Sequence, residues 1–275
     1  MAFDTKLSQG DTVNNDRLRS IFRCSTQGGM RRSHDTNTLV IVSDHIRSTY
    51  QDRWYGDVLH YTGMGLRGDQ KLQGNQNKTL LESRTNDVSV FLFEVFTEGT
   101  YTFQGQVVTA AEPYKEQQPD ADGNDRQVWM FPVRLVAGGQ GMEIDAITLS
   151  DLETKRSRQA RRKSDEEISR QTNNAPRKAG QRKTSSNQYQ RSEAVSEYAK
   201  RRASGHCDLC GQPPPFTDRD GKPFLESHHI VWLSRDGDDS ITNTVALCPN
   251  CHRKMHALDP DEDKDRLLKM ALRVI

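Results

Sequence analysis

The sequence has few apolar residues and no long apolar run. Only 33% of its 275 residues are hydrophobic and 7% are aromatic. No stretch approaches the roughly 20 apolar residues that a membrane-spanning helix needs, so an integral membrane protein is excluded. The N-terminal residues show no basic stretch followed by an apolar one, which predicts a cytoplasmic rather than a secreted protein.

Cysteine is scarce and unevenly placed. The chain has five cysteines, an odd number that cannot all pair, and four of them fall between Cys207 and Cys251. Such clustering favours metal ligation over a disulfide framework. The remaining Cys24 is expected to be a small buried apolar residue.

The net charge of +1 hides a strong segregation. Residues 1–150 carry a net −4, residues 155–202 a net +10 and residues 203–275 a net −3. The basic segment needs either a polyanionic partner or ample solvent. The Pro, Gly, Ser and Asn content of residues 172–188 favours a flexible linker. The expected organisation is therefore a domain over 1–150, a basic, partly helical linker over 151–190 and a second domain over 191–275.

Residues up to about 140 have the composition of a β-rich domain. Four segments are rich in β-branched and aromatic residues and are bounded by turn formers, which predicts strands, two of them in a hairpin closed at 97–99. A curled sheet or barrel follows, with a surface loop at 113–127. Helical patterns are few in this half and better developed beyond it. The predicted strands are 38–42, 88–96, 100–108 and 128–136, and the predicted helical segments are 44–50, 78–83, 155–171 and 191–203.

Two cysteine pairs indicate a structural zinc site. Cys207-Asp-Leu-Cys210 and Cys248-Pro-Asn-Cys251 are separated by 37 residues. Each pair can form a tight turn that presents two thiolates, and the intervening chain can return to complete a tetrahedral site. The zinc ion would supply folding free energy to a segment too small for a good core of its own.

Histidines between and after these cysteines resemble a known nuclease motif. Glu226-Ser-His228-His229-Ile230, Asn243 and Cys251-His252-Arg-Lys-Met-His256 are similar to the HNH, or ββα-metal, nuclease family over about residues 191–260. The resemblance implies a β-hairpin carrying the His pair, a loop carrying Asn243 and a helix from about Pro249. It makes His229 the general base and His228 a ligand of a catalytic cation.

The same residues suit phosphodiester hydrolysis chemically. The reaction needs a base to activate water and a divalent cation, such as Mg²⁺ or Mn²⁺, to neutralise developing charge. Neighbouring strand residues face opposite sides, so His228 and His229 are expected to have different roles. His252 and His256 are one helical turn apart and can reach one cation, although His256 could instead cap or pack the helix.

Two further polar residues have open roles. Asn243 would either hold the His229 loop or polarise its imidazole, which makes it, with His229 and His252, part of the predicted catalytic set. Glu226 would either tether a neighbouring group or remain solvated.

In the first half, an aromatic cluster precedes Tyr61-Thr-Gly-Met-Gly65, and Asn77-Lys-Thr-Leu-Leu81 follows. These motifs resemble the SRA (YDG) domain family, readers of modified cytosine, over about residues 10–140. Members of that family are curled β-barrels that flip one base into a pocket and stack it between aromatic rings. Tyr61 and Thr62 fall on the pocket-lining aromatic and threonine of the family motif.

The second pocket aromatic and the pocket acid should precede Tyr61. Tyr50 and Asp52 are the best candidates. The stretch between Tyr50 and Tyr61 is one residue shorter than in eukaryotic relatives and contains Trp54. Alternative pocket residues are therefore Trp54, Tyr55 and Asp57.

Together the two halves predict an α+β protein with an SRA-like curled β-barrel and a zinc-stabilised HNH domain. The combination resembles modification-dependent (type IV) restriction endonucleases. It implies cleavage of foreign double-stranded DNA that carries 5-methyl- or 5-hydroxymethylcytosine. A double-strand break needs two HNH sites, which favours a homodimer on DNA. The alternatives are a modified-DNA reader without cleavage, or a modification-independent HNH nuclease in repair or mobile-element processing.

Overall fold

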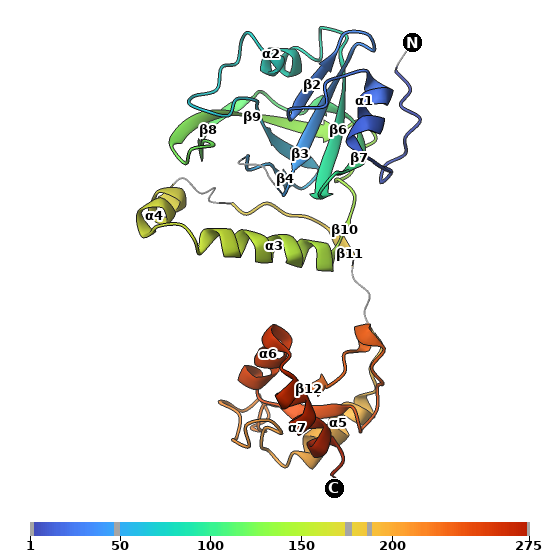
Figure 1. Cartoon of the computed structure of the whole chain (residues 1–275), viewed down its shortest axis with the longest axis vertical. Coiled ribbons are helices and arrows are strands. Elements are labelled where there is room, and N and C mark those ends of the chain that lie inside the picture. Colours follow the sequence, from blue (N-terminus) through green and yellow to red (C-terminus); the bar gives the residue numbers. More distant parts are fainter. Residues whose placement is uncertain (1–2, 47–49, 174–177, 186–188, 274–275) are drawn as a thin grey trace. The chain divides into compact units, whose positions relative to one another are not determined.

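The computed structural model describes residues 3–46, 50–173, 178–185 and 189–273. The chain forms two compact units, Met1–Ser186 and Asn187–Ile275 (Figure 1). None of the helices in the described ranges is long and apolar enough to cross a membrane.

A nine-stranded sheet organises the first unit. Its main path runs β2-β3-β6-β7-β9-β5-β4, with β1 paired to β7 and β8 paired to β9. The β3–β6 pair is parallel and the other pairs are antiparallel. The strands are β1 (Thr12–Val13), β2 (Met30–Ser33), β3 (Thr38–Asp44), β4 (Arg53–Tyr55), β5 (Val58–Thr62), β6 (Ser89–Thr97), β7 (Thr100–Thr109), β8 (Tyr114–Pro119) and β9 (Asp125–Leu135). The four predicted strands are thus confirmed.

The sheet is buried on both faces because apolar residues occupy successive positions of its central strands. In β3, Leu39 and Ile41 join one apolar cluster, whereas Val40 and Val42 join the other. Helix α1 (Asn15–Phe22) packs its buried side chains on the second cluster. Cys24 lies in that cluster and is 7% exposed, which confirms its expected place in the core. Helix α2 (Gln76–Leu81) confirms the short helix predicted at 78–83, whereas the segment predicted at 44–50 falls partly outside the described residues.

The surface loop predicted at 113–127 is wrong. These residues form β8, a turn and the start of β9, with Tyr114 opposite Met130 and Pro119 opposite Asp125. The Asp120 carboxylate accepts the backbone N–H groups of Asp122 and Asn124 and so stabilises the turn. Because β8 is at an edge of the sheet, it needs no apolar run and has a polar sequence.

Most of the residues expected to form a basic linker belong to the first unit, which extends to Ser186. The part of the chain from 144 to 185 forms β10 (Ile144–Asp145), α3 (Ala146–Ala160), α4 (Asp165–Asn173) and β11 (Thr184–Ser185), and β10 pairs with β11 in parallel. The single charged helix expected over 155–171 is therefore two helices. Figure 1 shows α3 extended alongside the sheet.

The second unit packs helices on a two-stranded hairpin. Strands β12 (Glu226–His229) and β13 (Thr244–Leu247) are antiparallel, with His228 opposite Val245. The predicted helices at 191–203 and from Pro249 are confirmed. Around the hairpin lie α5 (Glu193–Arg202), the 3₁₀ turn η1 (Leu233–Arg235), α6 (Pro249–Leu258) and α7 (Asp261–Ala271).

Candidate functional site

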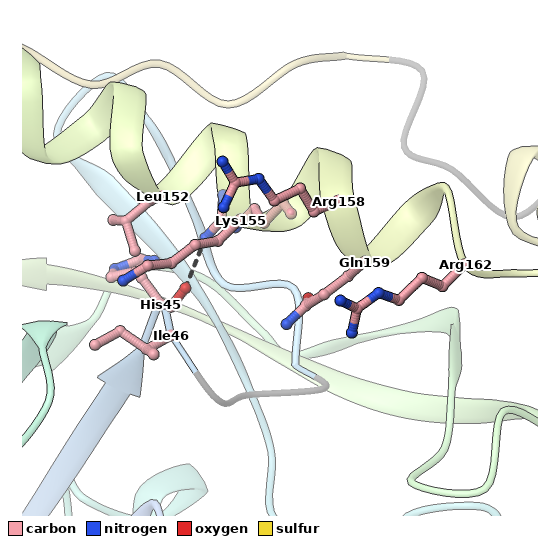
Figure 2. Close-up of a pocket in the computed structure, with 8 residues that line it drawn as sticks. His45, Ile46, Leu152, Lys155, Arg158, Gln159 and Arg162 are labelled. Carbon is pink, nitrogen blue, oxygen red and sulfur yellow. Dashed lines mark hydrogen bonds between the residues drawn. The ribbon is translucent and has the colours of Figure 1, made fainter.

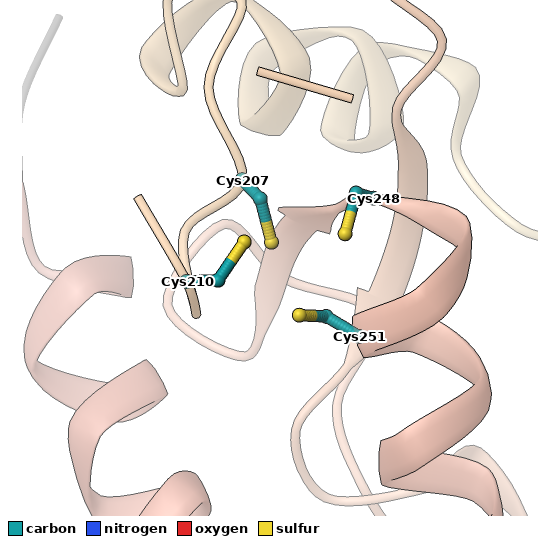
Figure 3. A group of neighbouring side chains, drawn as sticks. All are labelled: Cys207, Cys210, Cys248 and Cys251. Carbon is teal, nitrogen blue, oxygen red and sulfur yellow. The ribbon is translucent and has the colours of Figure 1, made fainter. Parts of the chain in front are cut away.

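Four cysteine sulfurs meet at one point of the second unit. Cys207 and Cys210 lie in the turn after α5, and Cys248 and Cys251 lie at the start of α6 (Figure 3). All four Sγ atoms lie within 4.8 Å of one another. Sulfurs bound about 2.3 Å from a tetrahedral zinc ion are separated by about 3.8 Å. The cluster therefore matches a zinc site after small side-chain adjustments.

The chemistry of this cluster also fits zinc. Burial raises the pKa of the Cys207 and Cys251 thiols, so both favour the neutral form unless a cation displaces the proton. Thiolates are soft ligands that select zinc over hard cations. The backbone and side chain of Asp208 form two hydrogen bonds with Ala246, of 2.9 and 2.8 Å, which fix the first cysteine turn on β13. A zinc ion here would link the turn after α5 to the start of α6.

Three imidazoles form a second cluster in this unit. His228 projects from β12, whereas His252 and His256 project from successive turns of α6. Their ring nitrogens lie within 4.8 Å of one another, and the Nε2 atoms of His252 and His256 are 3.1 Å apart. His228 is 2% exposed, and among the described residues its Nε2 has no hydrogen-bond partner. A buried nitrogen without a partner is costly, and a cation bound by the three rings would remove that cost.

Burial and neighbouring charges favour the neutral form of His228 and His256. Burial, followed by the neighbouring His252 and His256, lowers the pKa of His228 to about 3. Burial likewise lowers the pKa of His256. Glu226 Oε2 lies 2.9 Å from His252 Nδ1, so the carboxylate can fix the ring with Nε2 toward the cluster. Of the two roles expected for Glu226, the structure thus supports tethering.

His229 lies apart from the three-histidine cluster, as strand alternation requires. Its Nε2 is 2.8 Å from Asp239 Oδ1, and Asp239 Oδ2 accepts the backbone N–H of Ser192 at 2.6 Å. The His229 and Ser192 hydrogen bonds lower the pKa of Asp239. No sequence pattern singles out Asp239, because the same loop also contains Asp236 and Asp238.

Asn243 fastens the loop that follows His229. Its side chain forms two hydrogen bonds of 2.9 Å with the backbone of Val231 and donates to Asp238 O at 2.7 Å. The loop-holding role expected for Asn243 therefore agrees with its contacts. Its participation in catalysis remains a prediction.

A large polar cavity lies in the first unit. It has a volume of about 1060 Å³ and is lined by the end of β3, residues Tyr50–Arg53, the β8–β9 turn, α3 and α4. We call it the reader cavity. Two of the predicted pocket residues, Tyr50 and Asp52, line it. Asp52 accepts the Thr62 backbone N–H at 2.7 Å, and burial raises its pKa. Arg126 lies 5.6 Å from the centre of the Tyr50 ring.

The other predicted pocket residues are placed elsewhere. Trp54 and Tyr61 are 3% and 2% exposed and belong to an apolar core cluster. The Tyr61 hydroxyl donates to Gly29 O at 2.8 Å. Thr62 is buried and supports Asp52 through its backbone. The alternatives Tyr55 and Asp57 lie outside the lining described for the reader cavity, which leaves Tyr50 as its one predicted aromatic.

Comparisons with known proteins divide the chain in the same way. The model of the SRA domain of ScoMcrA-like proteins matches residues 9–151, just over half of the chain, and the HNH endonuclease model matches residues 207–258. The type IV methyl-directed restriction enzyme EcoKMcrA of Escherichia coli K12 is 46% identical over 68 residues. That match spans 25% of this chain and 24% of the relative.

Solved structures similar to the chain include two restriction endonucleases and the SUVH5 SRA domain. The phosphorothioation-dependent enzyme ScoMcrA is 20% identical, with a TM-score of 0.41 over 97% of this chain and 63% of its own. The modification-dependent TagI enzyme is 19% identical, with a TM-score of 0.37 over 92% and 78%. The SUVH5 SRA domain with methylated CHH DNA is 24% identical, with a TM-score of 0.38 over 50% and 94%. With the family match over residues 9–151, the chain belongs to the ScoMcrA-like SRA domain family and carries an HNH endonuclease domain after it.

Proposed function

We propose that the chain is a modification-dependent DNA endonuclease that restricts foreign DNA. In this proposal the first unit recognises 5-methyl- or 5-hydroxymethylcytosine in double-stranded DNA by base flipping, and the second hydrolyses phosphodiester bonds. The observation that carries it is the three-histidine cluster, whose buried, unpartnered His228 Nε2 suits a cation inside an HNH domain. The reader cavity would bind the modified base in the first unit of the same chain.

The proposed roles in hydrolysis follow from the contacts of each residue. His228, His252 and His256 would hold a divalent cation, which supplies neutralisation of charge on the phosphate and the leaving oxygen. His229 acts as general base: with Nε2–H donated to Asp239, Nδ1 accepts the proton of the attacking water. Asn243 keeps the loop after His229 in place.

The donor set also suggests which cation supports cleavage. Three neutral imidazoles suit transition-metal ions, whereas Mg²⁺ prefers oxygen ligands. We therefore expect Mn²⁺ or Ni²⁺ to support cleavage better than Mg²⁺. The four-cysteine cluster would hold zinc as a structural ion only.

Base recognition would use Tyr50 and Asp52. Tyr50 offers a ring for stacking, and Asp52, whose pKa is raised by burial, offers polar atoms for the edge of a base. Because one HNH site cuts one strand, a double-strand break would require two copies of the chain on the DNA.

The test is digestion of matched duplexes that are unmodified, methylated, hydroxymethylated or glucosylated, each with Mg²⁺, Mn²⁺ and Ni²⁺ in turn. Cleavage restricted to modified cytosine supports the proposal. Cleavage regardless of modification would instead favour an HNH nuclease in repair or mobile-element processing. Selective binding with no cleavage under any cation would favour a reader alone.

A further inference from the structure

The reader cavity has a second wall that the sequence assigns to a linker. One wall is formed by the sheet and its loops. The other is formed by α3, α4 and the turn between them, which contribute Arg156, Lys163, Glu167 and Arg170 among other residues. A smaller adjoining cavity of about 220 Å³ is lined by His45, Ile46 and side chains of α3 (Figure 2).

The helical wall is held in the first unit by several contacts. The strands before and after the helices, β10 and β11, pair with each other in a separate two-stranded sheet, and Leu152 of α3 is buried. On the return, Gln181 donates its backbone N–H to Trp54 O at 2.9 Å. A Cβ atom at Gly180 would lie 3.0 Å from Arg53 Cβ, so this limb packs closely on β4.

A buried ion pair completes the attachment. Both terminal nitrogens of Arg182 donate to the Glu94 carboxylate at 2.7 Å, and Glu94 is fully buried. His45 Nε2 lies 2.9 Å from the same carboxylate. Such contacts fix the helices as part of the unit, so a nucleotide that enters the reader cavity must meet α3.

The two walls differ in charge. The sheet side contributes four aspartates, and its one arginine, Arg53, is paired with Glu116. The helical side contributes Arg156, Lys163 and Arg170 with a single acid, Glu167, which pairs with Lys163. Within the described ranges Arg156 forms no ion pair, and its Nη2 donates to His45 O at 3.2 Å. This polarity suits a nucleotide whose base faces the sheet and whose phosphate faces the helices.

We propose that α3 and α4 form a fixed wall of the reader cavity and that Arg156 binds the phosphate next to the extruded base. The inference rests on the proposed function, because it assigns the DNA ligand of the same cavity. A charge-assisted contact to one phosphate adds affinity only when the nucleotide is in the cavity. Arg156 would thus contribute to the preference for modified DNA, unlike a cation that contacts DNA generally.

The test is a double-mutant cycle between protein and DNA. Binding of the zinc-loaded full chain is measured without added divalent cation, so that the DNA is not cut. The duplex carries one modified cytosine, and a neutral methylphosphonate replaces its 5′ or 3′ phosphate in turn. Arg156→Ala and the methylphosphonate at the contacted position should each weaken binding roughly tenfold, and together no more than either alone.

Arg161→Ala is the matched control, because Arg161 lies on the same segment, is exposed and belongs to neither cavity lining. It should weaken binding to modified and unmodified DNA equally, and its effect should multiply with that of the methylphosphonate. Arg156→Lys, which keeps the positive charge, should retain most of the affinity for modified DNA. If it does, the weaker binding of Arg156→Ala results from loss of the charge and not from misfolding.

Three results would overturn the proposal. Multiplicative effects of Arg156→Ala and methylphosphonate at both positions would show that Arg156 contacts neither phosphate. Tighter binding by Arg156→Ala would show that α3 obstructs the cavity. Equal binding of modified and unmodified DNA by the wild-type chain would refute the proposed function and this inference with it, whereas a preserved preference with multiplicative effects would refute the inference alone.

Discussion

The buried pair between Glu94 and Arg182 makes the stability of the first unit depend on pH. Burial alone would raise the pKa of Glu94, but hydrogen bonds and charge from Arg182 and His45 lower it from 4.5 to about 2. A shift of that size corresponds to about 3 kcal/mol of stability. Since the folded-state pKa is the lower one, this contribution is complete above about pH 4.5 and is lost as the pH falls toward 2.

Arg182→Met removes the guanidinium and leaves the carboxylate buried. Breaking one partner of a buried pair costs about 3–5 kcal/mol, and for a unit of this size that lowers Tm by on the order of 10 °C. Glu94 should then have a raised pKa, because among the described residues burial is opposed by His45 and by Trp54 Nε1, which lies 3.3 Å from the carboxylate. The difference in free energy of unfolding between wild type and Arg182→Met should therefore decrease as the pH falls from 7 toward 5.

Urea unfolding of the full chain measures both effects. Two of the three tryptophans, Trp54 and Trp129, lie in the first unit, so a Trp232→Phe background restricts the fluorescence signal to it. Glu94→Gln combined with Arg182→Met is the control and should be less destabilised than Arg182→Met alone at pH 7. If Arg182→Met lowers the free energy of unfolding by less than about 1 kcal/mol and leaves its dependence on pH as in wild type, this account of the Glu94 network is wrong.

Three further substitutions separate catalysis from folding. His229→Ala should abolish cleavage and leave zinc content and modified-DNA binding unchanged, and activity within a few-fold of wild type would assign the base elsewhere. Cys248→Ala should unfold the second unit and spare the first, and two wild-type melting transitions with full zinc content would contradict the four-cysteine site. Tyr61→Ala should cost roughly 3–5 kcal/mol of stability as a core truncation, with proportionate losses of binding to modified and unmodified DNA. Loss of discrimination at unchanged Tm would instead place Tyr61 on the flipped base.

The four-cysteine and three-histidine clusters can be predicted from the sequence because short segments supply their side chains. The spacing within each CxxC pair sets two sulfurs in one turn, and His252 and His256 share a helix face by periodicity alone. Each cluster then requires only one long-range approach, between the two cysteine turns or between β12 and α6. Asp239 escaped detection because its partner His229 is ten residues away across a loop whose path no local pattern specifies.

The residues proposed to bind the base are harder to predict, because the position of each side chain depends both on strand alternation and on burial. The motif around Tyr61 predicts an aromatic in a pocket, but in β5 the pleat directs this ring into the core cluster. Tyr50 and Asp52 precede β4 and so reach the cavity from a loop. The polar composition of β8 concealed an edge strand for a related reason, since edge strands do not require an apolar face.

Because most of the expected basic linker is folded into the first unit, the expected pattern of cleavage changes. The linker's composition is typical of a solvated tether, because the partner of Arg182, Glu94, is 88 residues away in sequence and no local feature indicates the pairing. With residues up to Ser185 attached to the first unit, only six residues separate Ser185 from Ser192, whose backbone N–H donates to Asp239 beside His229. The seven Cα–Cα steps from Ser185 to Ser192 span at most about 25 Å, whereas a free tether of some forty residues would allow cuts over many base pairs. We therefore expect the cut positions, mapped by sequencing the ends of digested DNA with a single modified cytosine, to fall within a narrow range of distances from it. Replacing Arg182 by Met, which frees the return limb, should broaden that range. A broad distribution in the wild-type chain would show that the segment is released from the first unit on DNA.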